Sequence, residues 1–358
     1  MAAHFHTLKI KNIKKETAEC VSISFDIPEN LETLFAFKEG QNITVKRNID
    51  GEEIRRSYSI CSAPYEKELR VAVKKIAGGS FSQFANDNLQ PGDMLEVLPP
   101  TGKFNAKLHA NKNCNYLAIA AGSGITPIMS IIKHTLQSEA NSCFTLIYGN
   151  RDRNSIIFFD ELEGLKNKYM QRFNFINILS RERTDAEIFY GRIDENKLIS
   201  LGKLLPYQSF DEIYLCGPEE LIFTASDHLQ KNGVAKANIH FELFTTPGQK
   251  NTAVKIKEQV ADSGPKSNIT IKLDGRSFDF DLNFNSSSIL DAALQQGADL
   301  PYACKGGVCA TCRAKLVEGE VDMDVNYALE QEEVEHGFIL TCQSHPRSNK
   351  VVVDFDVK

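Results

Sequence analysis

Four cysteines near the C-terminal end have the spacing of an iron–sulfur site. Cys304, Cys309 and Cys312 form a C-x4-C-x2-C run, and Cys342 follows thirty positions later. This is the plant-type spacing, in which four thiolates hold the two irons and two sulfides of a 2Fe-2S cluster. Gly306–Gly307 lies inside the run, where glycines tolerate positive φ and let the backbone fold closely over a cluster. These four thiols are therefore the predicted metal ligands.

Two other uses of four cysteines compete with the cluster. Structural zinc usually takes paired C-x2-4-C segments, and only Cys309 and Cys312 form one. Disulfides are typical of secreted proteins, but the sequence has no secretory signal and its other five cysteines are scattered. The cluster is thus the favoured prediction. Because a cluster moves single electrons, the rest of the chain is expected to supply electrons to it or draw them from it.

Two motifs in the first third of the sequence could bind a flavin. In Arg56-Ser57-Tyr58-Ser59, the guanidinium and the phenol project to one face of a strand, where they could hold a pyrophosphate and a flavin ring. Gly78–Ser82 (GGSFS) opens a helical pattern whose N–H groups could bind an anion. Each alone also fits a surface strand or a plain loop with a Ser cap. Their order within one β-rich region is what favours the flavin.

A third glycine-rich segment lies between an apolar strand and a helical pattern. Gly122 and Gly124 would let a pyrophosphate approach the backbone, Thr126 could donate to it, and Pro127 suits a first helical turn. Pro127 stands where the third glycine of G-x-G-x-x-G would be, so the motif is incomplete. The strand before it and the helix after it favour a nucleotide loop.

Two later strand ends complete the candidate nucleotide site. Ser180–Arg183 follows a strand, and Ser with Arg suits the 2′-phosphate of NADPH, where an acidic residue would bind a 2′-hydroxyl. A solvated run of charges is the alternative. Cys216-Gly217-Pro218 ends the next strand, and its small groups leave room for a flat ring. A buried apolar thiol is the alternative for Cys216.

These residues need three kinds of scaffold. Short β-rich runs with tight turns over 1–108 predict an antiparallel β-barrel flavin domain. Alternating strands and helices over 109–246 predict an α/β parallel-sheet NAD(P) domain, and 247–267 is predicted to be a linker. A hairpin at Asp274-Gly275 and a Ser-capped helix from Ile289 predict an α+β domain over 268–358.

The composition limits the partners. A net charge of −6 argues against nucleic acid, and no apolar run reaches membrane-spanning length. Nine mostly unpaired cysteines suit a reducing cytosol, so a cytoplasmic location is expected.

The whole set of motifs resembles the ferredoxin–NADP reductase-like flavoproteins that carry a C-terminal plant-type ferredoxin domain. The resemblance covers essentially the full chain and also rests on Tyr148-Gly149-Asn150-Arg151. Within the family, the domain order and the Ser180-Arg181-Glu182 segment look most like the reductase components of phenylacetyl-CoA epoxidases. The resemblance implies a β-grasp fold for the last domain and a role in phenylacetate catabolism. Relatives that hold FMN and favour NADH exist, but the Gly78–Ser82 and Ser180-Arg181 segments favour FAD and NADPH.

The resemblance also implies residue roles. Arg56, Tyr58 and Ser59 would hold the flavin, Ser82 would assist at its pyrophosphate, and Cys216 would lie near the nicotinamide C4. The catalytic residues expected are Cys216 and Ser59. The cofactor-binding residues expected are Arg56, Ser57, Tyr58, Ser59, Val73, Gly78, Gly79, Ser80, Ser82, Gly122, Gly124, Thr126, Pro127, Asn150, Arg151, Ser180, Arg181, Cys216, Gly217 and Pro218.

Electron counting gives the expected order of transfer. A nicotinamide gives two electrons as hydride and the cluster accepts one, so a flavin must stand between them. We expect electrons to pass from NADPH through FAD and the 2Fe-2S cluster to a di-iron oxygenase component, the phenylacetyl-CoA ring epoxidase. The alternatives are a reductase of another oxygenase or hydroxylase, with NADPH or NADH as the donor, a reductase of quinones or small molecules, and a non-enzymatic carrier.

An acidic stretch before the fourth cysteine is a candidate docking surface. Eight carboxylates and no Lys or Arg lie between Glu318 and Glu335. Such a surface could steer a basic partner toward the cluster, either the oxygenase or the chain's own flavin domain with Lys74 and Lys75. An ordinary solvated face is the alternative.

Overall fold

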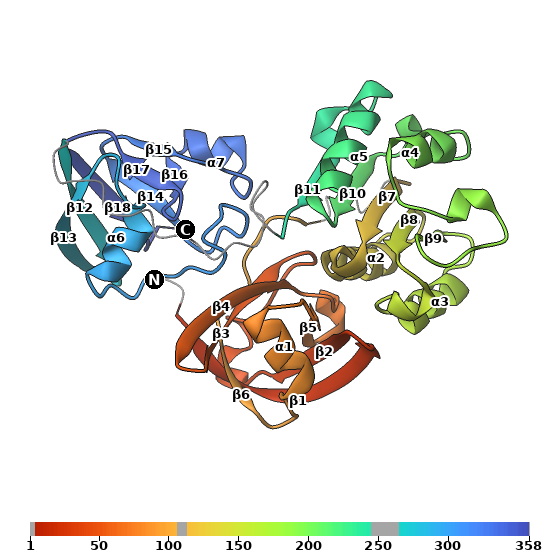
Figure 1. Cartoon of the computed structure of the whole chain (residues 1–358), viewed down its shortest axis with the longest axis horizontal. Coiled ribbons are helices and arrows are strands. Elements are labelled where there is room, and N and C mark those ends of the chain that lie inside the picture. Colours follow the sequence, from red (N-terminus) through yellow and green to blue (C-terminus); the bar gives the residue numbers. More distant parts are fainter. Residues whose placement is uncertain (1–3, 106–112, 245–264, 358) are drawn as a thin grey trace. The chain divides into compact units, whose positions relative to one another are not determined.

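The computed structural model describes residues 4–105, 113–244 and 265–357. These residues fall into two compact units, one of which contains Thr7–Ile54 and Tyr58–Leu243. That unit holds an antiparallel barrel and a parallel sheet, and the other holds the C-terminal sheet (Figure 1). The predicted boundary at 108–109 and most of the predicted linker 247–267 lie outside the described residues. The first strand after the linker begins at Lys266.

The N-terminal domain is a six-stranded barrel with the strand order β4-β3-β6-β1-β2-β5. Ile60, just after β4, pairs with Val71 of β5, so the two edges of the sheet meet. Helix α1 (Ser80–Asp87) packs against β5 and buries Phe81 in the barrel core. The predicted barrel is therefore confirmed. Its strands are β1 (His6–Thr17), β2 (Cys20–Asp26), β3 (Asn42–Ile49), β4 (Glu52–Ser59), β5 (Leu69–Lys74) and β6 (Met94–Val97).

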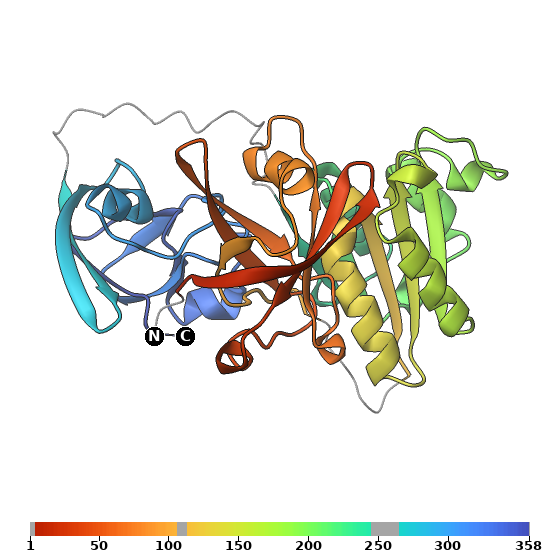
Figure 2. The same cartoon turned by 90° about the horizontal axis from the view of Figure 1, so that it is seen from below.

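The middle domain is a five-stranded parallel sheet of order β11-β10-β7-β8-β9. The order reverses between β7 and β10, which is the switch point where such sheets bind nucleotides. Figure 2 shows α2 lying along the strands of this sheet. The strands are β7 (Asn115–Ala121), β8 (Cys143–Asn150), β9 (Phe173–Leu179), β10 (Glu212–Cys216) and β11 (Ile239–Glu242), and the helices are α2 (Ile125–Ser138), α3 (Phe159–Lys168), α4 (Glu195–Gly202) and α5 (Glu219–Lys231).

A short turn precedes helix α3 of this domain, which begins at Phe159 and not at Ser155, where the apolar pattern of the sequence predicts a helix start. Asp152 caps a short 3-10 turn at Arg153–Ser155, and Phe158 then takes a left-handed φ of 63°. The chain therefore turns once before the α-helix can start.

The C-terminal domain has a sheet of order β13-β12-β18-β14-β16 with α6 against it. Asp274 and Gly275 both have positive φ, 52° and 69°, as a two-residue hairpin requires. The Ser288 hydroxyl accepts from Asp291 N at 3.2 Å and caps α6. These two predictions are confirmed. The elements are β12 (Lys266–Leu273), β13 (Arg276–Asn283), α6 (Ile289–Gln295), β14 (Arg313–Glu318), β15 (Val321–Met323), α7 (Gln331–Glu335), β16 (Phe338–Leu340), β17 (Ser344–Pro346) and β18 (Lys350–Asp354).

In the described part of the chain, no helix is both long and apolar enough to cross a membrane.

Candidate active site

The nucleotide loop, Gly122–Gly124, joins β7 to α2. Gly122 has a φ of 54°, and a Cβ on Gly124 would lie 2.1 Å from the carbonyl oxygen of Cys216. Only glycine fits the second position without moving the backbone. The Tyr148 hydroxyl donates to Gly122 O at 2.8 Å. The chain itself therefore holds the loop in a shape that a pyrophosphate can approach closely.

Thr126 and Pro127 lie in the first turn of α2, and both are buried. The Thr126 hydroxyl donates to Ser123 O at 3.0 Å, so it stabilises the turn of the loop. Pro127 lies where a missing N–H costs little. The backbone N–H groups of this turn are the donors that suit a pyrophosphate.

Cys216, Glu242 and Ser59 meet at the carboxyl edge of the parallel sheet. Cys216 ends β10 and lies in register with Glu242 at the end of β11. The Ser59 hydroxyl, from the end of β4 in the barrel, donates to Glu242 Oε2 at 2.9 Å. Burial, reinforced by the Glu242 charge, raises the pKa of Cys216 well above its ordinary value. A neutral thiol, a hydroxyl and a carboxylate therefore surround the point where the barrel meets the sheet.

Such groups suit hydride transfer between two flat rings. A neutral thiol is a poor nucleophile, so Cys216 offers packing and polarity rather than covalent chemistry. Gly217 packs closely against β7, because a Cβ there would lie 3.2 Å from Ala121 N, and Pro218 is the N-cap residue of α5. The structure thus brings together the two residues predicted to be catalytic, Cys216 and Ser59, through a carboxylate that the sequence analysis did not name.

The ends of β8 and β9 bring two arginines together. Ser180 N donates to Asn150 O at 2.9 Å, and Arg181 N donates to Arg151 O at 2.7 Å. Both arginine side chains are exposed at this edge, and Arg151 lies 3.6 Å from a carboxylate oxygen of Glu19. Two guanidinium groups and a serine at one strand edge suit a phosphate.

The flavin segment lies on β4, as predicted. Arg56 is exposed, and Tyr58 is half-buried with its ring centroid 5.6 Å from that of Phe81. Ser57 lies between them and is half-buried. Val73 is fully buried, and its carbonyl accepts from Asn86 Nδ2 at 3.0 Å. An exposed guanidinium and a partly exposed phenol on one strand fit a flavin.

The segment Gly78–Ser82 forms the entry to α1. Gly78 has a φ of 75° and Gly79 is the N-cap. The Ser82 hydroxyl accepts from Ile76 N and donates to Gly79 O, both at 3.1 Å, so it stabilises the loop. The first-turn N–H groups, starting with the exposed Ser80, have no partner within the helix. This turn fits the pyrophosphate of FAD.

The four thiols predicted to bind the cluster form two hydrogen-bonded pairs. Cys304 donates to Cys309, and Cys312 to Cys342, so the pKa of Cys309 is lowered to about 6 and that of Cys342 is also lowered. Among the described residues, no single point gathers three or more candidate ligands. A pair of thiolates for each of two irons is what a 2Fe-2S cluster needs. The donor set fits that cluster.

Backbone and side-chain N–H groups face these sulfurs. Gly306 N donates to Cys304 Sγ at 3.3 Å, and Gln343 Nε2 donates to Cys342 Sγ at 3.5 Å. Such donors stabilise negative charge on sulfur and tune the potential of a cluster. Gln343 gave no signal in the sequence beyond its place beside a ligand.

Lys74, which the sequence suggested only as a docking residue of the flavin domain, is a further residue of the nucleotide site. A Cβ on Gly122 would lie 3.4 Å from Lys74 Nζ, so this ammonium from the end of β5 lies against the nucleotide loop. Its position at a strand end was the only signal. Glu242 was marked in the sequence in a similar way, because it is a charged residue at the end of the last strand of the sheet.

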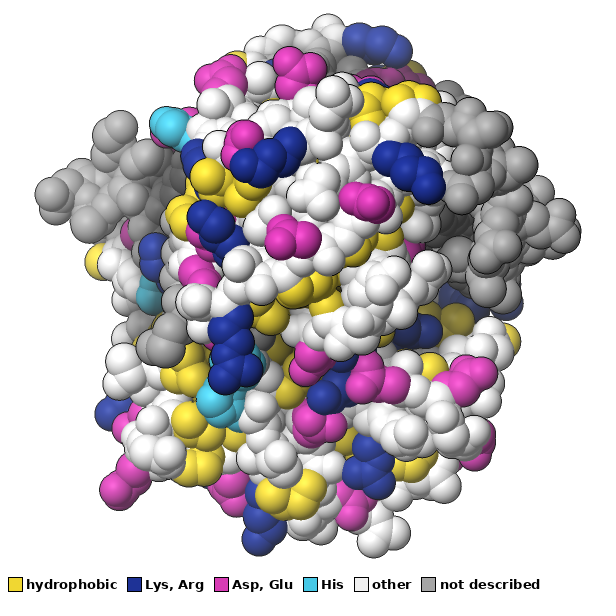
Figure 3. Space-filling view, turned by 90° about the vertical axis from the view of Figure 1, so that its left-hand side faces the viewer, with side chains coloured by type: hydrophobic (Ala, Val, Ile, Leu, Met, Phe, Trp, Pro, Cys, Tyr) yellow, Lys and Arg dark blue, Asp and Glu magenta, His cyan; other side chains and the backbone are white. Residues whose placement is uncertain are grey.

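The acidic stretch divides into paired and exposed carboxylates. Among the described residues, Glu320, Glu330, Glu332 and Glu335 are exposed and form no ion pair. On the face drawn in Figure 3, by contrast, basic and acidic side chains are interspersed. The ion-paired members are Glu318 with Lys350, Asp322 with Arg347, Asp324 with His345, and the buried Glu333 with Arg313.

Comparisons with known proteins agree with this arrangement. Family models match in order along the chain: an oxidoreductase FAD-binding domain over 7–106, an oxidoreductase NAD-binding domain over 118–227 and a 2Fe-2S iron-sulfur cluster binding domain over 271–347. The structure of phthalate dioxygenase reductase superposes with a TM-score of 0.59 at 26% identity and covers 98% of each chain.

Two relatives match over nearly the full length. The 1,2-phenylacetyl-CoA epoxidase subunit, designated E, from Escherichia coli (strain K12) is 47% identical over 355 residues, covering 99% of this chain and 98% of the relative. The ferredoxin reductase component of 3-ketosteroid-9-alpha-monooxygenase from Rhodococcus rhodochrous is 31% identical over 354 residues, covering 97% and 96%.

Fold, site and family models together define an NAD(P)-dependent flavin and iron–sulfur oxidoreductase that transfers electrons. The chain belongs to the family of oxygenase reductase components that includes this phenylacetyl-CoA epoxidase subunit.

Proposed function

We propose that the protein passes electrons from NADPH, through FAD and a 2Fe-2S cluster, to the di-iron oxygenase component of a phenylacetyl-CoA ring epoxidase. The observation that carries the proposal is the 47% identity with the E. coli epoxidase subunit over 99% of the chain. A bound flavin can accept two electrons as a hydride and pass them on one at a time. A cytoplasmic location belongs to the same proposal.

Each predicted site residue has a role in this proposal. Ser59, Cys216 and Glu242 hold the nicotinamide and flavin rings in contact, and the buried neutral thiol excludes water there. The nucleotide loop, with Thr126 and Pro127 behind it, binds the pyrophosphate of NADPH. Lys74 adds a positive charge beside that loop. In the same proposal, Gly217 and Pro218 pack beside the two rings.

The 2′-phosphate is assigned to Arg181, with Arg151, Asn150 and Ser180 beside it. The FAD is assigned to Arg56, Ser57, Tyr58, the backbone near Val73, and the turn formed by Gly78, Gly79, Ser80 and Ser82. The cluster is assigned to Cys304, Cys309, Cys312 and Cys342. The domains proposed are 1–108, 109–246 and 268–358, which contain the ranges of the three family matches.

The test is reconstitution with the oxygenase component of a phenylacetyl-CoA epoxidase. We expect NADPH oxidation to become coupled to substrate epoxidation near one to one. Cys342→Ser provides the control, since it should still reduce a dye from the flavin but should not support epoxidation. NADPH consumption that stays uncoupled from epoxidation, with the wild type fully loaded with both cofactors, would contradict the assignment of the acceptor.

A second candidate is a reductase for another oxygenase that uses NADH. The 31% identical R. rhodochrous relative, which belongs to a ketosteroid monooxygenase, supports it. Steady-state comparison of NADPH with NADH, followed by assays with other oxygenase components, separates the two candidates.

A further inference from the structure

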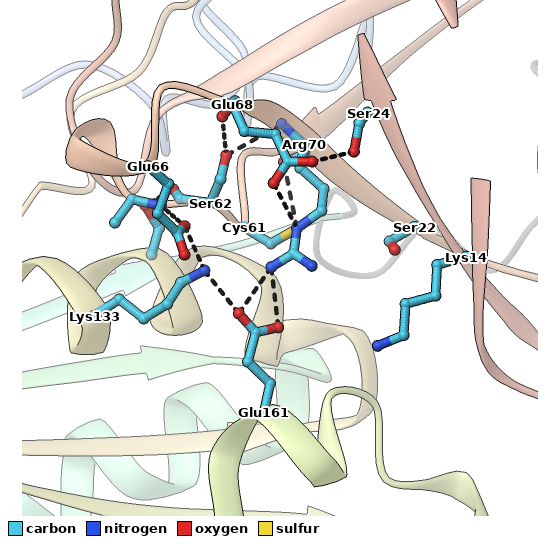
Figure 4. Close-up of polar contacts among 12 residues, drawn as sticks. Lys14, Ser22, Ser24, Cys61, Ser62, Glu66, Glu68, Arg70, Lys133 and Glu161 are labelled. Atoms are coloured by element: carbon cyan, nitrogen blue, oxygen red, sulfur yellow. Dashed lines mark hydrogen bonds and ion pairs between the residues drawn. The ribbon is translucent and has the colours of Figure 1, made fainter. Parts of the chain in front are cut away.

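A partly buried group of charged residues links the barrel to the parallel sheet away from the nucleotide loop. We call it the charge hub; it consists of Glu66, Arg70, Lys133 and Glu161 (Figure 4). Arg70 Nη2 donates to both carboxylate oxygens of Glu161, at 2.9 and 3.0 Å. Lys133 Nζ donates to Glu161 Oε1 at 2.9 Å and to Glu66 Oε2 at 2.6 Å. Two cations of the hub therefore share two carboxylates, and Arg70 Nε also lies 3.8 Å from a carboxylate oxygen of Glu68.

The four members come from both domains of this unit. Arg70 lies on β5 and Glu66 on a 3-10 turn, Pro64–Glu66, and both belong to the barrel. Lys133 lies on α2 and Glu161 in the first turn of α3, and both belong to the parallel-sheet domain. The Lys133–Glu66 and Arg70–Glu161 ion pairs therefore join one domain to the other.

The hub is also tied to the two segments that carry the candidate site. α2 begins directly after the nucleotide loop, and its buried Ser130 donates to Ser62 O of the barrel at 2.6 Å. Cys61 and Ser62 follow β4, the flavin strand, and Cys61 N donates to Arg70 O at 2.8 Å. A change at the hub therefore reaches both the nucleotide loop and the flavin strand through short, direct connections.

The two cations of the hub are buried, whereas the side chains of its carboxylates, Glu66 and Glu161, are 27% and 24% exposed. The Lys133 side chain is 3% exposed and that of Arg70 is 13% exposed. Burial alone would raise the pKa of Glu161, but Lys133 and Arg70 outweigh it, so its pKa is lowered and the carboxylate stays charged. Removing one member leaves an opposite charge buried without its partner, which favours a shift of the two domains.

We propose that the charge hub is a positioning device that sets the angle between the barrel and the parallel sheet, and so the distance between flavin and nicotinamide. The Ser59–Glu242 hydrogen bond, the Ser130–Ser62 hydrogen bond and the Arg151–Glu19 ion pair join the same two domains at other points. The hub's members touch neither reacting ring. The inference rests on the proposed function, because it concerns the geometry of hydride transfer at the same site.

The test is Glu161→Gln in the full-length protein loaded with both cofactors. We expect the rate of flavin reduction by NADPH in stopped flow to fall at least tenfold, with the nucleotide KM changed less than twofold. The long-wavelength charge-transfer absorbance of the reduced enzyme with NADP+ should weaken. Amide hydrogen exchange should rise in residues 61–66. Glu161→Asp, which keeps the charge, should restore part of the rate.

Glu96→Gln is the matched control, because the exposed Glu96 forms an ion pair with Lys46 at 2.8 Å elsewhere on the barrel. It should leave all four measurements unchanged. If Glu161→Gln does not fold, the charge-balanced variant Glu66→Gln with Lys133→Met removes both ion pairs of Lys133, leaves Arg70 paired with Glu161, and should give the same loss of rate.

A variant of lower melting temperature but unchanged flavin-reduction rate and charge-transfer band would overturn the proposal, because it would leave the hub only a structural role. A wild type that reduces its flavin with neither NADPH nor NADH would instead refute the proposed function, and the hub's role in hydride transfer with it.

Discussion

The nucleotide loop and the cluster loop both bend the backbone with glycines, but different forces hold them. The nucleotide loop packs on its own sheet, where Gly124 leaves room for the Cys216 carbonyl and Tyr148 bonds to Gly122. In the cluster loop, Lys305 and Ala310 take left-handed φ values of 51° and 53° although neither is glycine. Each such residue costs about 1–2 kcal/mol.

This difference indicates which site is complete before its ligand binds. The nucleotide loop is held by hydrogen bonds and packing within the chain, so it is preformed. The cluster loop carries strain that metal–thiolate bonds would offset, since metal binding supplies folding free energy at such sites. The NAD(P)-binding domain should therefore tolerate loss of its ligand better than the cluster domain does.

The largest expected effect is loss of a cluster ligand. Cys342→Ser leaves one iron without a thiolate, so the visible bands of the cluster should disappear. NADPH-dependent reduction of a dye that accepts directly from the flavin should persist. A full-strength cluster spectrum in Cys342→Ser would show that this cysteine is not the fourth ligand. The same change at Cys114, a buried cysteine far from the predicted ligands in sequence, is the control and should keep the spectrum.

Next in size is Gly124→Ala in the nucleotide loop. The added Cβ would lie 2.1 Å from Cys216 O, so the backbone at the ring site must move. A displacement near 1 Å lowers catalysis by about a hundredfold, and we expect that loss in NADPH-to-dye turnover. The control is Gly164→Ala on α3, where a Cβ meets nothing within 4 Å and should stabilise the helix by about 0.5–1 kcal/mol. Equal turnover in the two variants would contradict the account of a tightly packed loop.

Much of the difference between the nucleotide loop and the cluster loop could be predicted from the sequence, because local residue patterns mark both loops. The four cysteines and Gly122–Gly124 indicate their chemistry by type and spacing. Glu242, Lys74 and the hub could not be predicted, since each becomes functional only when segments far apart in the chain meet. Glu161 and Arg70 are 91 positions apart, and nothing local marks either as part of a pair.

Arg181→Ala should have an intermediate effect. Its charge-assisted contact with a 2′-phosphate is worth about 1.5–3 kcal/mol, so the KM for NADPH should rise at least about tenfold while that for NADH barely changes. Steady-state kinetics with both nucleotides measures this. Equal changes for both nucleotides, or a wild type that prefers NADH, would rule out the assignment.

The smallest effect is expected at the acidic stretch. The structure excludes Glu333 from a docking role, because it is buried and paired with Arg313 at 2.9 Å. Neutralising Glu320, Glu332 and Glu335 together should slow electron delivery to the oxygenase a few-fold at about 50 mM salt and less at about 200 mM, where screening is stronger. Stopped-flow transfer from flavin to cluster reports any internal contact. If neither step changes, the stretch is a solvated face.

On the proposed route, electrons pass from NADPH to the flavin and only then to the cluster. Anaerobic stopped flow with NADPH in excess, followed separately at flavin and cluster wavelengths, measures this order. We expect the flavin band to bleach first and the cluster band to follow. We also expect no cluster reduction in flavin-depleted protein. Cluster reduction by NADPH at an undiminished rate in flavin-depleted protein would show that electrons reach the cluster by another route.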